Sequence, residues 1–161
     1  MAQMAVVESR LSVLGRPAAP LDMDLSPILA ERAQLRSEAG IFIDIEGVQS
    51  ETFSHGLGAR LTAEGFTLSE NMDQAAGLIM GKIRIQPLDL KDPHVFFVRA
   101  LADVDIVDLD TGVALAAFSE NVRKGHVDER EAQRKALDQL ADMVAQKINQ
   151  TMGTLGMTAG N

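Results

Sequence analysis

Apolar and polar residues alternate along residues 98–106, and this is the clearest periodicity in the chain. The apolar positions are Val98, Ala100, Ala102, Val104 and Ile106. The positions between them are Arg99, Leu101, Asp103 and Asp105. A period of two is typical of a strand that turns one face to the core and the other face outward.

A hairpin turn and four further strands are predicted around this strand. Asp110, Thr111 and Gly112 follow it, and the triplet suits a turn because aspartate hydrogen-bonds to nearby backbone and glycine adopts positive φ. The return strand is expected at residues 113–122. Ile-rich residues 41–47 and the apolar residues 78–85 predict two more strands, and residues 66–68 a short additional one.

Helical spacing appears in two longer segments. In the first, Phe53, Leu57 and Leu61 recur at intervals of four between a capping Ser50 or Thr52 and a terminating glycine. Gly58 lies near this stripe, which indicates close packing of the helix on a sheet. In the second, Asp128 and Glu131 form a capping pair before a stripe made of Leu137, Leu140, Ala141, Val144 and Ile148.

These elements predict an α/β (α+β) fold with two layers. We expect a mostly antiparallel sheet of four or five strands, with two long amphipathic helices on one face. A short N-terminal helix is expected at residues 27–37, because Ser26 and Pro27 suit its start. Residues 1–25 are expected to form an extended arm, residues 26–152 one domain and residues 153–161 a flexible tail.

Composition narrows the classes of partner. The 161 residues include 15 Lys and Arg against 23 Asp and Glu, a net charge of −8, which argues against a broad electrostatic hold on nucleic acid or anionic lipid. Cysteine is absent, which excludes disulfides and thiolate sites. No window approaches the roughly 20 apolar residues of a spanning helix. The first residues show no signal-peptide pattern, and a lipid anchor upstream of Met1 stays open.

One triplet has a catalytic counterpart. Aspartic proteases carry an Asp-Thr-Gly whose two copies bring carboxylates together, and here a single copy at Asp110 is followed by Val113. The hairpin turn is the favoured interpretation, and a dimeric acid protease that uses Asp110 remains the alternative.

Other chemistry is poorly supported. Asp103, Asp105, Asp108 and Asp110 form an acidic ladder that lacks the glycine and glutamate of a calcium-binding EF-hand. The Gly-Lys in residues 77–82 lacks the first glycine of a phosphate-binding loop, and the three histidines are scattered. We therefore expect no catalytic residues, no cofactor and no metal.

The order of these segments resembles that of bacterial envelope lipoproteins and periplasmic accessory domains. The likeness rests on residues 41–47 and 53–65, the Ala-Ala-Gly-Leu-Ile-Met-Gly run at 75–81, residues 102–112 and the Ala-rich last helix. It is similar to the curli secretion lipoprotein, the penicillin-binding-protein activator lipoprotein, the flagellar T protein and the TolB N-terminal domain. A weaker likeness is to the TraT surface-exclusion lipoprotein, and the lipopolysaccharide-assembly lipoprotein shares the same element order.

This resemblance implies a non-enzymatic protein of the periplasm, anchored at the outer membrane or free, that acts in envelope assembly or secretion by protein contact. The partner is then an envelope protein or a second copy of the chain. The expected contact is the outer face of the strand with Arg99, Asp103 and Asp105, or a sheet edge free for strand addition. A small-ligand carrier and a cytoplasmic scaffold stay as alternatives.

Overall fold

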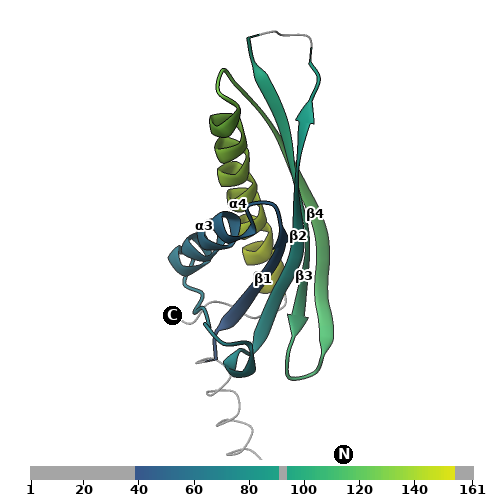
Figure 1. Ribbon diagram of the computed structural model, residues 1–161. Coiled ribbons are helices and arrows are strands. Elements are labelled where there is room, and N and C mark those ends of the chain that lie inside the picture. The colour runs from purple at the N-terminus through teal and green to yellow at the C-terminus, as the bar shows by residue number, and fades with distance from the viewer. Residues whose placement is uncertain (1–38, 91–93, 155–161) are drawn as a thin grey trace, which may run out of the picture. The chain divides into compact units, whose positions relative to one another are not determined.

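Four strands form one sheet, and two helices pack against the same face of it (Figure 1). The computed structural model describes residues 39–90 and 94–154. The predicted arm at residues 1–25, the predicted helix at 27–37 and residues 155–161 of the predicted tail lie outside this part. The two layers confirm the α/β sandwich predicted from the sequence.

The elements follow one another as a parallel crossover and then an antiparallel meander. In chain order they are β1 (Ile41–Gly47), α3 (Ser50–Ala63), the 3-10 turn η1 (Met72–Gln74), β2 (Gly77–Leu88), β3 (Phe96–Asp108), β4 (Val113–His126) and α4 (Glu129–Thr154). Strand β1 pairs in parallel with β2, and β2–β3 and β3–β4 are antiparallel. The spatial order β1-β2-β3-β4 makes β1 and β4 the edges.

The short strand predicted at residues 66–68 is reduced to a single parallel bridge between Ile41 and Leu68. The Ile41 N–H donates to the Thr67 carbonyl at 2.8 Å, and the Ser69 N–H donates to the Ile41 carbonyl at 3.0 Å. Phe66, at the start of this segment, is buried in the core.

The core lies between the helices and one face of the sheet. The alternating residues Val98 to Ile106 of β3 are at most 2% exposed, which confirms the predicted inward face. The predicted helical stripes are also confirmed. Their buried members are Phe53, Leu57 and Leu61 of α3, and Leu137, Leu140, Ala141, Val144 and Ile148 of α4.

Gly58 lets α3 lie close to the sheet. A Cβ at this position would come within 3.0 Å of Leu68 Cδ1 and 3.7 Å of Ile43 Cδ1. The close packing that the sequence indicates at this glycine is therefore confirmed.

The two helices begin differently. The Asp128 carboxylate accepts the Glu131 N–H at 2.9 Å, so the predicted cap of α4 is confirmed. The cap predicted for α3 is wrong, because Gln49 occupies that position with φ of 60° and no capping side-chain bond. Its amide instead donates to the Gln133 side chain at 3.0 Å and ties the start of α3 to α4.

The turn between β3 and β4 is held by Asp108. The carboxylate accepts the N–H of Asp110 at 3.0 Å and of Thr111 at 3.2 Å, and Gly112 adopts φ of 67°. The predicted hairpin turn is confirmed, with Asp108 holding these two backbone groups where the sequence analysis had assigned that role to the aspartate of the triplet.

Leu140→Ala should lower the free energy of unfolding by about 2–5 kcal/mol, because Leu140 is fully buried and its loss leaves a cavity under the sheet. Chemical denaturation followed by circular dichroism measures this. Lys147→Ala on the exposed side of the same helix is the control and should change stability by less than about 0.5 kcal/mol. Equal effects of the two variants would contradict the packing described.

Asp108→Ala should lower the free energy of unfolding by about 1–3 kcal/mol, because it leaves two backbone N–H groups of the turn without their acceptor. Asp108→Asn keeps an oxygen at the same place and should retain most of the stability. If both variants unfold at the same denaturant concentration as the parent, the turn does not depend on this side chain.

Candidate functional site

The face of the sheet opposite the helices carries most of the charged side chains of the strands. We call it the helix-free face, because the side chains that alternate with the core residues point to it and no described helix covers it. Arg99, Asp103 and Asp105 of β3 all lie on it, as the sequence predicts. The strand register adds the charged residues Asp44 and Glu46 of β1, Lys82 and Arg84 of β2, and Arg123 of β4.

Asp103 lies near the middle of this face and is held by its own chain. Its Oδ2 accepts a bond from Arg84 Nη2 at 2.5 Å, and its Oδ1 accepts the Ser119 hydroxyl at 2.6 Å. About half of each charged side chain is exposed, so the ion pair contributes at most about 1 kcal/mol to stability. Its main effect is to fix the position of the Asp103 carboxylate.

Arg99 does not pair with Asp103, which lies about 13 Å away along the same strand. Its register neighbours are Gln86 on β2 and Arg123 on β4. Among the described residues neither Arg99 nor Arg123 has an ion-pair partner, and Arg99 Nε is buried without an acceptor. Like charges directly opposite each other weaken a sheet, so this pair is unfavourable within the chain.

Asp105 is exposed and lies beside uncharged residues. Its register neighbours are Met80 of β2 and Ala117 of β4, and Met80 is itself 41% exposed. The acidic ladder predicted from the sequence is only partly correct. Asp108 is 6% exposed and belongs to the opposite side of the strand, so Asp103 and Asp105 are the β3 carboxylates of the helix-free face.

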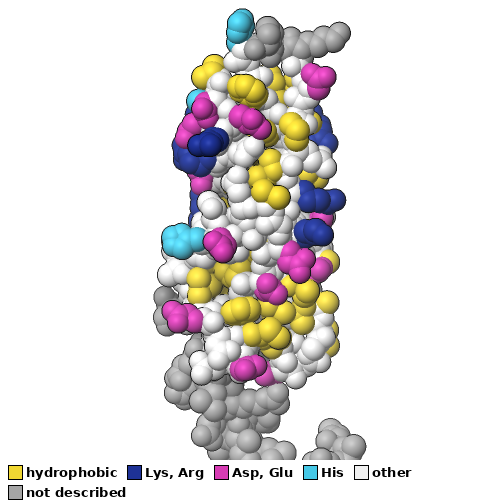
Figure 2. All heavy atoms as spheres, viewed as in Figure 1, with side chains coloured by type: hydrophobic (Ala, Val, Ile, Leu, Met, Phe, Trp, Pro, Cys, Tyr) yellow, Lys and Arg dark blue, Asp and Glu magenta, His cyan; other side chains and the backbone are white. Residues whose placement is uncertain are grey.

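Charge changes sign along this face. Toward the right of Figure 2, on the side away from the helices, basic side chains lie above acidic ones, and hydrophobic side chains gather below. By register, the apolar residues near the β3–β4 turn are Phe42, Leu78 and Val107, and those near the opposite end are Leu88 and Phe97. The surface is thus a charged band between two apolar ends.

Sequence analysis missed Arg84, Ser119 and Arg123 as members of this surface. The alternation of β2 and β4 contains the signal for their faces, but only the strand register shows that Arg84 and Ser119 reach Asp103 and that Arg123 lies opposite Arg99.

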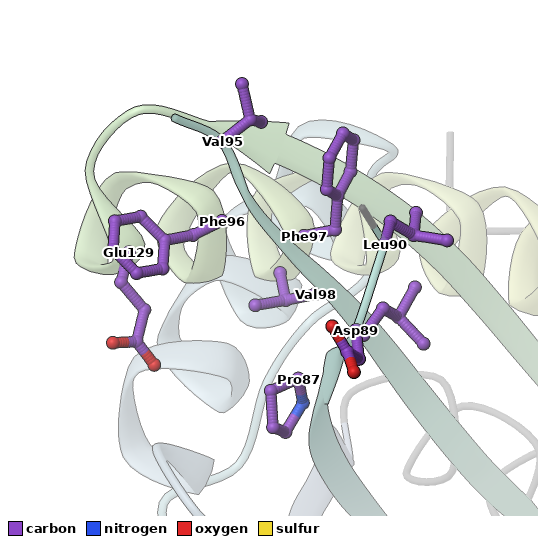
Figure 3. Close-up of a pocket in the computed structure, with 9 residues that line it drawn as sticks. Pro87, Asp89, Leu90, Val95, Phe96, Phe97, Val98 and Glu129 are labelled. Carbon is purple, nitrogen blue, oxygen red and sulfur yellow. The ribbon is translucent and has the colours of Figure 1, made fainter. Parts of the chain in front are cut away.

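A pocket of about 210 Å³ lies at the far end of the β2–β3 pair (Figure 3). Its walls are Pro87, Leu88, Asp89, Leu90, Val95, Phe96, Phe97, Val98 and Glu129. The figure shows Phe96 and Glu129 together on one side of β3 and Phe97 on the other. The two carboxylates, Asp89 and Glu129, are the ionisable groups of this lining, and its other seven residues are apolar.

Catalytic and metal chemistry find little support in the described residues. Within residues 39–90 and 94–154, no group of three His, Asp or Glu side chains is placed to hold a metal ion. Asp110 is exposed at the turn tip, two residues from the buried Asp108. No helix in this part of the chain has both the length and the apolar character to cross a membrane.

Arg134 of α4 pairs with carboxylates of its own helix, while Asp142 of α4 pairs with Arg60 of α3. Arg134 bonds to Glu131 at 2.9 Å and to Asp138 at 3.1 Å. The hydrogen bond from Arg134 lowers the pKa of the Glu131 carboxyl and raises that of the guanidinium. The Arg134 guanidinium is therefore occupied by carboxylates of its own helix.

Solved structures share this fold at low identity. A minor lipoprotein from Acinetobacter baumannii is 17% identical with a TM-score of 0.57, and the match covers 67% of this chain and 88% of that one. A Caulobacter crescentus protein is 16% identical with a TM-score of 0.52 over 81% and 99%. A Xanthomonas campestris protein is 7% identical with a TM-score of 0.60 over 74% and 88%. These likenesses show the fold alone.

Sequence comparison supplies the family. No curated protein matches the chain. The predicted likenesses to the curli secretion lipoprotein, the penicillin-binding-protein activator, the flagellar T protein, TolB and TraT are not confirmed and stay predictions. The family model of the TP0693-like lipoprotein C-terminal domain matches residues 59–149, which is more than half of the chain. The protein therefore belongs to the TP0693-like lipoprotein family and is associated with the cell envelope.

Proposed function

We propose that this protein is a non-enzymatic accessory protein on the periplasmic side of the envelope that acts by protein contact through the helix-free face. One observation carries the proposal. Two helices cover one face of the four-stranded sheet, while the opposite face bears a charged band that no described helix covers. Charged and polar groups of fixed position select a partner mainly by electrostatic complementarity.

The three residues that the sequence singles out have different parts in this contact. Asp103 is fixed by Arg84 and Ser119 and gives the face a rigid centre. Arg99 offers a guanidinium to a carboxylate of the partner, because it has no ion-pair partner among the described residues. Asp105 is exposed and offers a carboxylate to a cation of the partner.

The absence of enzymatic activity is part of the proposal. It is supported by the lipoprotein family and by the lining of the β2–β3 pocket, whose side chains include no nucleophile beside a base. The periplasmic place, an outer-membrane anchor and a part in envelope assembly or secretion follow from the family only as proposals. A sheet edge such as β4 could also add a strand, but the ordered charges favour the face.

Photocrosslinking in the cells that produce the protein tests the contact. A photoreactive amino acid at Asn121, which is exposed on the helix-free face, should give a defined adduct. The same amino acid at Gln146, which is exposed on α4, is the matched control and should give little adduct. Equal adducts from the two positions, or none from Asn121, would overturn the proposed surface.

Charge reversal tests which residues of the helix-free face bind the partner. Arg99→Glu combined with Asp103→Arg should reduce the Asn121 adduct about tenfold or more, because the first change turns an attraction across the interface into a repulsion and the second removes the carboxylate that Arg84 and Ser119 hold in place. Circular dichroism and thermal unfolding should show a folded protein, since both side chains are on the surface of the sheet. An undiminished adduct from a folded variant would remove these residues from the site.

A further inference from the structure

Strand β3 displays a self-complementary series of side chains on the helix-free face. Read from its start, the series is Phe97, Arg99, Leu101, Asp103, Asp105 and Val107. Reversing the order exchanges the two apolar ends and exchanges Arg99 with Asp105. An antiparallel copy of the same strand would therefore place apolar against apolar at the two ends, and Arg99 against Asp105 at the two positions next to the ends.

We infer that the partner of the helix-free face is a second copy of this chain. This inference rests on the proposed function and names its partner. The two sheets pack face to face about a two-fold axis that crosses β3 at the level of Ala102. Each Arg99 then faces Asp105 of the partner subunit, and each Phe97 faces Val107 of the partner subunit. An interface of this kind is isologous, so every contact occurs twice.

This arrangement pairs two groups, Arg99 and Asp105, that have no ion-pair partner among the described residues of one chain. Arg99 stands directly across from the like charge of Arg123. Asp105 lies between Met80 and Ala117 and has no cation beside it in the register. Two sheets pack about 10 Å apart, a gap that the side chains of an arginine and an aspartate together can span.

The centre of the interface is already neutralised within each subunit. Leu101 faces Asp103 of the partner subunit, and that carboxylate carries its own bonds from Arg84 and Ser119. On β2 the same axis brings Lys82 near Arg84 of the partner subunit, where Glu46 and Asp103 lie beside these two cations on their own chains.

Sedimentation velocity on the full 161-residue chain tests the dimer, with single and paired charge changes. The parent should dimerise in a concentration-dependent way. Arg99→Asp alone and Asp105→Arg alone should each weaken the dimer about tenfold or more, because each replaces two attractions by two repulsions. Lys147→Glu, on the exposed side of α4, is the matched control and should leave the dimer unchanged.

Mixing the two single variants gives the sharpest result. An equimolar mixture of Arg99→Asp and Asp105→Arg chains should form a heterodimer tighter than either variant forms alone, because both opposed pairs then have opposite charges. The double variant that carries both changes in one chain should regain the homodimer. Failure of the mixture and of the double variant to associate would overturn this geometry.

The mass of the Asn121 adduct distinguishes a failure of this inference from a failure of the proposed function. An Asn121 adduct with twice the mass of the chain supports the second copy. An Asn121 adduct of another mass, together with a parent chain that stays monomeric up to about 0.5 mM, overturns the second copy and leaves the helix-free face as a contact for a different protein. Binding of the chain to vesicles of anionic lipid that depends on Arg99 and Arg123 would likewise overturn it.

Discussion

The packing of α4 on β3 and β4 is the interaction on which the rest of the structure depends. Leu140, Val144 and Ile148 are fully buried, and each such side chain contributes about 1.5–3 kcal/mol when removed from water. Because α4 and α3 both cover the same side, the sheet has one apolar face in the core and one face that no described helix covers. The charged band follows from this one-sided packing, since a strand covered on one face alternates core and surface residues.

Small residues make this packing close. Ala100 and Ala102 of β3 are buried beneath the helices, and α4 brings its own alanines to the same interface, namely Ala132, Ala136, Ala141 and Ala145. The helix backbone can therefore lie near the sheet, and the larger leucine and isoleucine side chains fill the space between. The closely packed helices support the sheet and keep the side chains of its opposite face at fixed spacings. Fixed spacings are what electrostatic selection of a partner requires.

Local periodicity predicted most of the helices and strands of this fold. It did not predict which residues lie opposite each other on neighbouring strands. The strand at Ile41–Gly47, the inward residues of β3 and the apolar stripe of α4 all follow from local alternation. The bond from Arg84 to Asp103 depends on strand register, which a single sequence does not determine. Asp108 was grouped with the surface acids because its burial depends on the turn that it holds.

Carboxylate footprinting tests most directly whether the helix-free face is the partner-binding surface of this lipoprotein. Water-soluble carbodiimide with an amine label should modify Asp44 and Asp105 readily in dilute purified protein, because both are exposed. In intact cells these two residues should be protected, while Asp73 in η1 should be labelled equally in both conditions. Equal labelling of Asp105 in cells and in dilute solution would show that no partner covers the helix-free face.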